Sequence, residues 1–222
     1  MQAALSGMNS RLSAIGAGDG GGSRSGAGSS SGGGATRSIL DRNPNRLRNS
    51  EVSLSAFGFL FSELVQHAQR SAKGISDLER TLNLVGYRVG QRYLELLVFR
   101  DRGSKRDTRL LNVLLFINTN VWKQVFGKPA DVLEKSSENE DEYMISDNDL
   151  LVNRFVSVPK EMSQLNTGAF VAGIVEAILD GSGFPARVTA HTVPIEGFPF
   201  RTTILIKFDP KVLAREKRLG DK

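Results

Sequence analysis

Residue types that carry out chemistry are sparse in this sequence. It has two histidines, His67 and His191, and no cysteine. Neither histidine has a carboxylate or a second ligand beside it, and a lone histidine at the edge of a helix or strand is usually structural. Without cysteine there is no thiol nucleophile, thiolate metal site or disulfide framework. We therefore expect a protein that is not an enzyme, with no catalytic residue, no metal and no cofactor.

Two glycine-rich stretches look like phosphate-binding loops but lack the surrounding pattern. Residues 16–21, GAGDGG, match G-x-G-x-x-G letter for letter, yet they follow no predicted strand and open no predicted helix. Residues 181–186, GSGFPA, lack the Lys-Ser/Thr pair that a phosphate loop requires. Neither stretch predicts a nucleotide site.

An acidic stretch between residues 134 and 149 contains enough oxygen ligands to suggest calcium. It lacks the D-x-D-x-D-G order of a calcium loop and has no central glycine. A solvated turn between two strands explains the acidic residues better.

Charge and composition divide the chain into an arm and a domain. Residues 16–35 are almost entirely Gly, Ser and Ala, which predicts a flexible segment. Six arginines and two aspartates before residue 51 give the arm +4 of the total charge of +5. We expect a disordered, Gly/Ser-rich and Arg-bearing extension over 1–49, one domain over 50–215 and a short tail over 216–222. For the arm, a spacer, a phosphorylation target and a weak anionic-membrane contact remain open. The rival hypotheses are a transit peptide and a salt-dependent nucleic-acid contact.

Hydrophobic periodicity predicts helices grouped beside antiparallel hairpins. Helices are expected over 52–70, over about 77–100 with a break near Gly86, over 109–126, and over 167–180. The last of these would be about 21 Å long, too short to span a bilayer. Strands are expected over 130–137, 142–148, 186–193 and 201–208. This order indicates an α+β layer fold.

The predicted helices carry more apolar surface than one modest core needs. On the first helix, one arc about 140° wide at 100° per residue contains Leu54, Phe57, Leu60, Phe61, Leu64, Val65 and Ala68. Phe59 and Val52 lie on the opposite, polar side. This surplus favours a face that binds a partner protein. The alternative is a lipid-binding or acyl-chain-binding α+β domain, with the surplus lining an internal pocket.

Three motifs in a fixed order carry a family resemblance. SVPKE (157–161), F-x-A-G-I-V-E-A (170–177) and GFPA-x-VTAH (183–191) follow the segment SEVSLSAFGFLFSELVQHAQR, residues 50–70. Together they resemble the small subunits of the transport protein particle (TRAPP) over about residues 50 to 215. The resemblance implies an α/β plait, with helices packed on a twisted four-stranded antiparallel sheet.

The resemblance also implies a function and partners. Small subunits of this family pair as heterodimers through their first helices, and one such chain sits between another small subunit and a longin-fold subunit. The assembly tethers vesicles in transport from the endoplasmic reticulum to the Golgi and is an exchange factor for a Rab GTPase. We expect a cytoplasmic scaffold, peripheral at the endoplasmic reticulum and cis-Golgi, that binds no nucleic acid. An acylated cysteine known in a related subunit has no counterpart here. The expected paired-helix residues are Leu54, Phe57, Phe61, Leu64, Val65, Val89, Tyr93 and Leu97.

Overall fold

A four-stranded antiparallel sheet is the base of the domain. The computed structural model describes residues 53–100, 106–159, 162 and 164–220; the expected extension over 1–49 lies outside them. The strands are β1 (Val132–Lys135), β2 (Glu142–Asp147), β3 (Ala186–Thr192) and β4 (Thr202–Phe208), in the order β1-β2-β4-β3. Both predicted hairpins are present, and they join where β2 pairs with β4. The predicted α+β class is confirmed.

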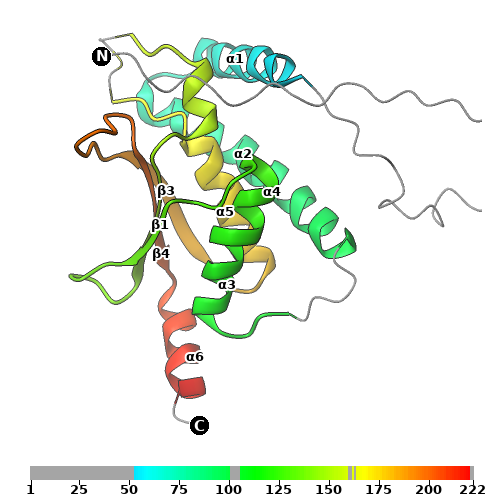
Figure 1. Ribbon diagram of the computed structural model, residues 1–222, viewed down its shortest axis with the longest axis vertical. Coiled ribbons are helices and arrows are strands. Elements are labelled where there is room, and N and C mark those ends of the chain that lie inside the picture. Colours follow the sequence, from blue (N-terminus) through cyan, green and yellow to red (C-terminus); the bar gives the residue numbers. More distant parts are fainter. Residues whose placement is uncertain (1–52, 101–105, 160–161, 163, 221–222) are drawn as a thin grey trace, which may run out of the picture. The chain divides into compact units, whose positions relative to one another are not determined.

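The helices form layers on one face of this sheet. Next to the sheet lies α5 (Ala169–Gly181), and α2 (Ile75–Arg100) packs on α5 (Figure 1). The sheet directs alternate apolar side chains toward them, including Ile145, Ile204 and Ile206, which are fully buried. The predicted helix over 167–180 is thus the centre of the core, with nine buried residues in thirteen.

Glycines let α2 and α5 approach closely. A Cβ on Gly86 would lie 1.9 Å from the carbonyl oxygen of Phe170, and one on Gly173 would lie 2.0 Å from that of Asn83. The expected break near Gly86 is therefore wrong. The helix α2 continues through this glycine because the residue faces α5, where any side chain would collide with backbone.

The third predicted helix is not a regular one. It consists of α3 (Leu110–Phe116), a π-helical turn (Ile117–Val121) and α4 (Trp122–Phe126). Leu111 and Leu115 are exposed, yet Trp122, which a regular helix would place on the same stripe, is buried. The wider π turn changes the phase of the helix, so that the indole enters the core. There Trp122 Nε1 donates to Asp147 Oδ2 at 2.8 Å.

The structure adds a last helix that the periodicity analysis did not predict. The helix α6 (Pro210–Gly220) crosses residue 215, where the domain was expected to end. Its start follows ordinary rules, since Asp209 Oδ1 accepts the Lys211 backbone N–H at 2.9 Å and proline occupies the first helical position. Glu216 then binds Arg109 Nε at 2.8 Å and ties α6 to the start of α3.

Candidate interaction surface

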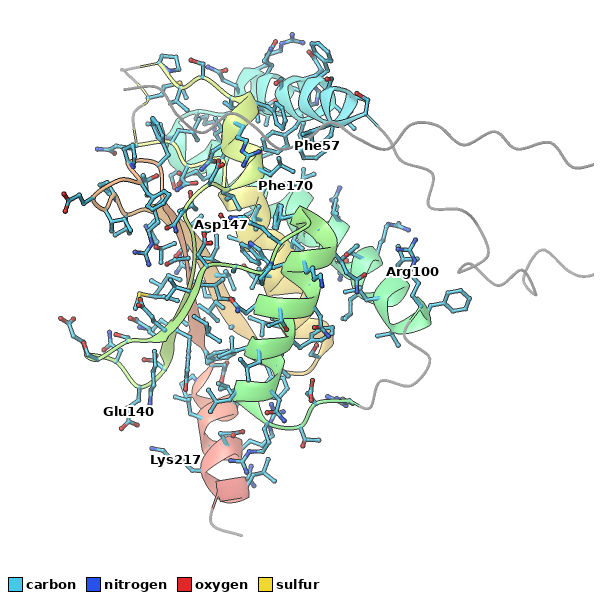
Figure 2. The ribbon with its side chains drawn as sticks, in the orientation of Figure 1. Phe57, Arg100, Glu140, Asp147, Phe170 and Lys217 are labelled. Carbon is cyan, nitrogen blue, oxygen red and sulfur yellow. The ribbon has the colours of Figure 1, made fainter. Side chains whose placement is uncertain are left out.

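The first helix, α1 (Leu54–Ser71), attaches to the domain along one face only. Phe61 packs edge-on against Phe170 of α5, with ring centroids 5.4 Å apart. Phe57 packs against Phe155 at 6.1 Å, and Phe155 belongs to the 3₁₀ turn Leu151–Phe155. Gly58 leaves room for that ring, because a Cβ there would lie 2.8 Å from Phe155 Cδ1. Figure 2 shows Phe57 and Phe170 on the side of α1 that faces the domain.

The opposite face of α1 exposes large apolar side chains. Phe59 lies on this face and is 79% exposed, and Leu60, about 100° from it at the edge of the face, is 72% exposed. Leu54 is on the stripe of Phe61 but is 52% exposed at the start of the helix. Neighbouring residues on this face are polar, including Glu63 and Arg70, which form a weak exposed ion pair at 3.9 Å. Single exposed apolar residues are ordinary, but adjacent Phe and Leu on a helix whose inner face is already packed indicate a binding surface.

The helix α2 continues this pattern on its solvent side. Its inner stripe (Leu78, Leu82, Gly86, Gly90 and Leu97) is buried against the domain. Its outer side exposes Leu84, Val89, Leu96 and Val98. Two consecutive helices therefore each bury one stripe and expose apolar residues elsewhere, which is more than a solvated surface requires.

The eight expected interface residues divide into three groups. Leu54 and Val89 are exposed; Phe57, Leu64 and Tyr93 are partly buried; and Phe61, Val65 and Leu97 lie in the chain's own core. Burial also raises the pKa of the Tyr93 hydroxyl, an effect that the charge of Arg100 partly offsets. Partner contact therefore remains a prediction for the first two groups.

The predicted apolar arc of the first helix is only partly packed. Leu54 and Leu60 belong to the arc but are exposed, whereas Phe61, Val65 and Ala68 are buried. Phe59, expected on the opposite, polar side as a sign of a partner-binding face, is exposed there.

The described residues contain no group of three or more His, Asp or Glu side chains that could hold a metal. His191 Nε2 pairs with the neighbouring Thr189 hydroxyl at 2.8 Å, which is a structural contact. The acidic turn is partly neutralised, since Lys207 Nζ binds Glu142 at 2.9 Å. That bond, with one from Asn139, lowers the pKa of Glu142.

The GSGF stretch performs a structural task, the capping of α5. Gly183 adopts φ +82° at the turn after the helix. Arg106 Nη2 donates to the Ser182 carbonyl at 3.0 Å, and Arg215 Nη1 donates to that of Gly183 at 2.8 Å. Cations at a helix C-terminus also complement its dipole.

Comparison with known proteins decides the family. The family model described as "Transport protein particle (TRAPP) component" matches residues 57–209. The chain belongs to the TRAPP family. Trafficking protein particle complex subunit 5 of Dictyostelium discoideum is 55% identical over 179 residues, which cover 80% of this chain and 96% of the relative. The human subunit 5 is 46% identical over 182 residues, covering 82% and 93%.

More distant TRAPP proteins also match this chain. Subunit 31 of Saccharomyces cerevisiae is 31% identical and covers 76% of this chain. A crystal structure of subunit 3 from Naegleria fowleri, covalently bound to palmitic acid, superposes with a TM-score of 0.61 at 17% identity, covering 70% of this chain and 95% of that one. That likeness shows the fold alone. Among the helices of the described ranges, none has the length and apolar character to cross a bilayer.

This chain is thus related to structural components of a trafficking complex. Other TRAPP subunits fit as its partners, because the relatives named above are themselves subunits of that complex. The exposed faces of α1 and α2 are the candidate contact surface.

Proposed function

We propose that this chain is a scaffold subunit of a multisubunit vesicle-tethering complex in transport from the endoplasmic reticulum to the Golgi. The observation that carries the proposal is the pair Phe59 and Leu60, 79% and 72% exposed on a helix whose other face is packed. Permanent protein interfaces are hydrophobic and resemble a domain core cut in half, which suits these two side chains. Membership of the TRAPP family supplies the class of partner.

The partner at α1 and α2 would be a paralogous small subunit. Pairing buries the exposed residues Leu54, Phe59, Leu60 and Val89, and it closes over the half-buried Phe57, Leu64 and Tyr93. The core residues Phe61, Val65 and Leu97 support this surface from behind. A longin-fold subunit would bind elsewhere on the chain, so that the chain bridges two partners.

Nucleotide exchange on a Rab GTPase would belong to the assembled complex. The chain contributes position and shape, without catalytic residues of its own. It would act in the cytoplasm and reach the endoplasmic reticulum and cis-Golgi as part of a peripheral assembly.

An exchange assay tests this role. Fluorescent nucleotide release from a panel of Rab GTPases is measured with the reconstituted complex, with the complex lacking this chain, and with the chain alone. We expect exchange on one Rab by the full complex, at least a tenfold loss without the chain, and none by the chain alone. Full exchange without the chain would contradict the proposal.

The acyl-chain alternative gains no support from the cavity that the described residues form beside β3. Its lining includes Glu79, Glu176, Arg187 and His191, and these suit a polar occupant better than a hydrocarbon chain.

A further inference from the structure

Strand β3 has an open edge. It is the last strand in the order β1-β2-β4-β3, so only one of its sides is paired. Just beyond its ends, Val193 N donates to Arg201 O and Asp209 N donates to Pro185 O, both at 3.0 Å. These bonds fix the phase of the ladder, because hydrogen-bonded pairs alternate along antiparallel strands.

The phase identifies which backbone groups face outward. Residues 185 and 193 face β4, so Arg187, Thr189 and His191 between them do too. Val188, Ala190 and Thr192 must therefore direct their N–H and C=O groups away from β4. Val188 is only 2% exposed, so the groups that a ligand can reach are the N–H and C=O of Ala190 and of Thr192. Within the described ranges, no backbone or side-chain group hydrogen-bonds to these four groups. An open row of donors and acceptors is a template for another strand.

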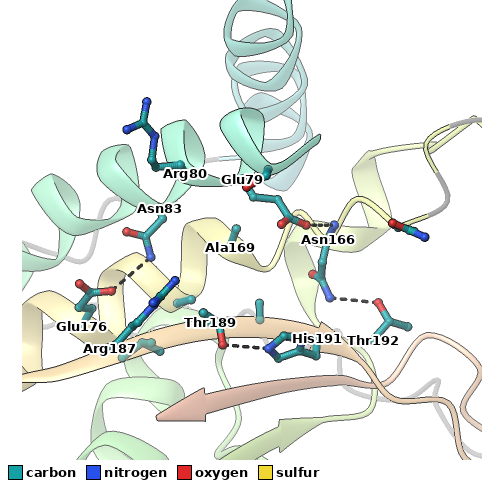
Figure 3. Close-up of a pocket in the computed structure, with 15 residues that line it drawn as sticks. Glu79, Arg80, Asn83, Asn166, Ala169, Glu176, Arg187, Thr189, His191 and Thr192 are labelled. Carbon is teal, nitrogen blue, oxygen red and sulfur yellow. Dashed lines mark hydrogen bonds between the residues drawn. The ribbon is translucent and has the colours of Figure 1, made fainter. Parts of the chain in front are cut away.

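This edge opens into a cavity of about 650 Å³ rather than onto a flat surface. Strand β3 forms one wall, the first turns of α2 form the opposite wall, and α5 lies behind (Figure 3). Small side chains leave the space free, namely Ala169 and Ala172 from α5 and Ala190 from the strand.

Hydrogen bonds hold the walls in place. Asn83 Nδ2 donates to Glu176 Oε2 at 3.4 Å, from α2 to α5. Glu79 Oε1 accepts the Asn166 backbone N–H at 2.9 Å, and Asn166 Nδ2 donates to the Thr192 hydroxyl at 3.0 Å. The cavity is thus a built groove between fixed elements, as Figure 3 shows.

We propose that the groove between β3 and α2 binds an extended peptide segment of a partner protein, which adds to the sheet as a fifth strand. Its backbone would exchange hydrogen bonds with Ala190 and Thr192, the mode known as β-augmentation. The charged lining is balanced, with Glu79 and Glu176 against Arg80 and Arg187. Recognition therefore rests on backbone bonds and on small residues facing α5, rather than on net charge.

This site is separate from the exposed faces of α1 and α2. The small-subunit pairing proposed above uses the exposed apolar residues of α1 and α2, from Leu84 onward in α2. This groove uses the edge of β3 and the polar first turns of α2, including Glu79 and Arg80. Each can therefore fail without affecting the other.

Hydrogen exchange combined with peptide selection tests the proposal. A random 12-residue peptide library displayed on phage is selected on the full chain, and enriched peptides are synthesised. In the free chain, the amides of Ala190 and Thr192 should exchange faster than those of Thr189 and His191. Bound peptide should slow exchange at Ala190 and Thr192 by at least tenfold.

Ala190→Pro is the matched variant. It removes an N–H that faces the groove and leaves the bonds to β4 intact, and proline is tolerated at such edge positions. Peptide affinity should fall at least tenfold, with little change in the melting temperature. If the variant does not fold, the hydrogen-exchange data on the natural chain alone test whether the peptide binds at this edge. No enriched peptide, protection confined to α1 and α2, or a dimer of this chain that Ala190→Pro abolishes would overturn the proposal.

Discussion

At the scale of single residues, two phenylalanines in α1 have opposite surroundings. Phe61 is 2% exposed and packs on Phe170, whereas Phe59, two positions earlier, is 79% exposed. Helical geometry alone places them about 160° apart at 3.6 residues per turn. The sequence analysis expected Phe61 at the partner interface, but the structure places it in the core.

Glutamate substitutions should therefore separate folding from binding. We expect Phe61→Glu to lower the free energy of unfolding by more than about 4 kcal/mol, because it buries an unpaired charge. Phe59→Glu should change that free energy by less than about 0.5 kcal/mol, as for other exposed positions. Urea denaturation of both variants measures the difference, and equal losses would contradict the assignment of the two faces.

Asp147 is a buried acceptor that joins three segments. Its carboxylate accepts Trp122 Nε1 at 2.8 Å, Lys128 Nζ at 2.7 Å and the Asp149 N–H at 3.0 Å. Burial lowers the pKa of Lys128, but the hydrogen bonds and charges of Asp147 and Asp131 together outweigh that effect and raise it. We expect Asp147→Asn to lower the free energy of unfolding by about 1–3 kcal/mol, because an amide satisfies fewer donors. Asp131 is an exposed partner of Lys128, so Asp131→Asn should lower the free energy of unfolding by less than about 1 kcal/mol. An unchanged free energy of unfolding in Asp147→Asn would contradict this role of Asp147.

The Glu142–Lys207 pair predicts a pH dependence with a definite sign. The bond from Lys207 lowers the pKa of Glu142 from its ordinary 4.5, and the bond to Glu142 raises the pKa of Lys207 from 10.5. A lowered carboxyl pKa gives stability above 4.5 that is lost as the pH falls below it. A raised lysine pKa gives stability below 10.5 that is lost as the pH rises above it. Urea midpoints of the natural chain and of Glu142→Gln should differ between these two values, and the difference should shrink as the pH falls below 4.5. A difference that stays constant with pH would contradict the pairing.

At the scale of elements, the contact between α2 and α5 depends on having no side chain at three positions. Cβ atoms on Gly86, Gly90 and Gly173 would lie 1.9, 2.6 and 2.0 Å from backbone oxygens of the facing helix. Each glycine weakens its own helix by up to about 1 kcal/mol relative to alanine. The close contact offsets this loss of helix stability, because it brings the apolar stripes of the two helices together.

Alanine at these glycines should be strongly destabilising. We expect Gly86→Ala and Gly173→Ala each to lower the free energy of unfolding by more than about 3 kcal/mol, because the helices must separate. Gly74→Ala is the matched control, with no atom within 4 Å of its Cβ position, and should be nearly neutral. Thermal unfolding followed by circular dichroism compares them. Similar melting temperatures for all three would contradict the close contact.

Much of this architecture could be predicted from periodicity, and the failures have physical causes. The strands and the core helix α5 stand out because their apolar patterns are dense. The π turn could not be predicted, since it depends on the tertiary contact between Trp122 and Asp147. The helix α6 was missed because only Val212 is fully buried on it, although Asp209 and Pro210 signalled its start. The side of α1 that packs inward depends on the contact between Gly58 and Phe155. These residues are far apart in sequence, so periodicity could not predict their contact.

At the scale of the whole molecule, one domain offers surfaces of two kinds. The exposed faces of α1 and α2 are apolar and helical, as in permanent complexes. The groove beside β3 is polar and presents free backbone groups, which suits a reversible contact with a flexible segment. This combination fits a scaffold subunit that stays within an assembly and still receives further partners.

Light scattering after gel filtration tests the central claim most directly. The full chain is measured alone and mixed with a subunit 3 of the TRAPP complex, as the natural sequence and as the double variant Phe59→Glu, Leu60→Glu. Gln124→Glu adds a charge to an exposed position on α4 and serves as the control. We predict a 1:1 complex for the natural chain and the control, and none for the double variant although it remains folded. A natural chain that stays monomeric in the mixture, or a double variant that pairs as well as the control, would contradict the account.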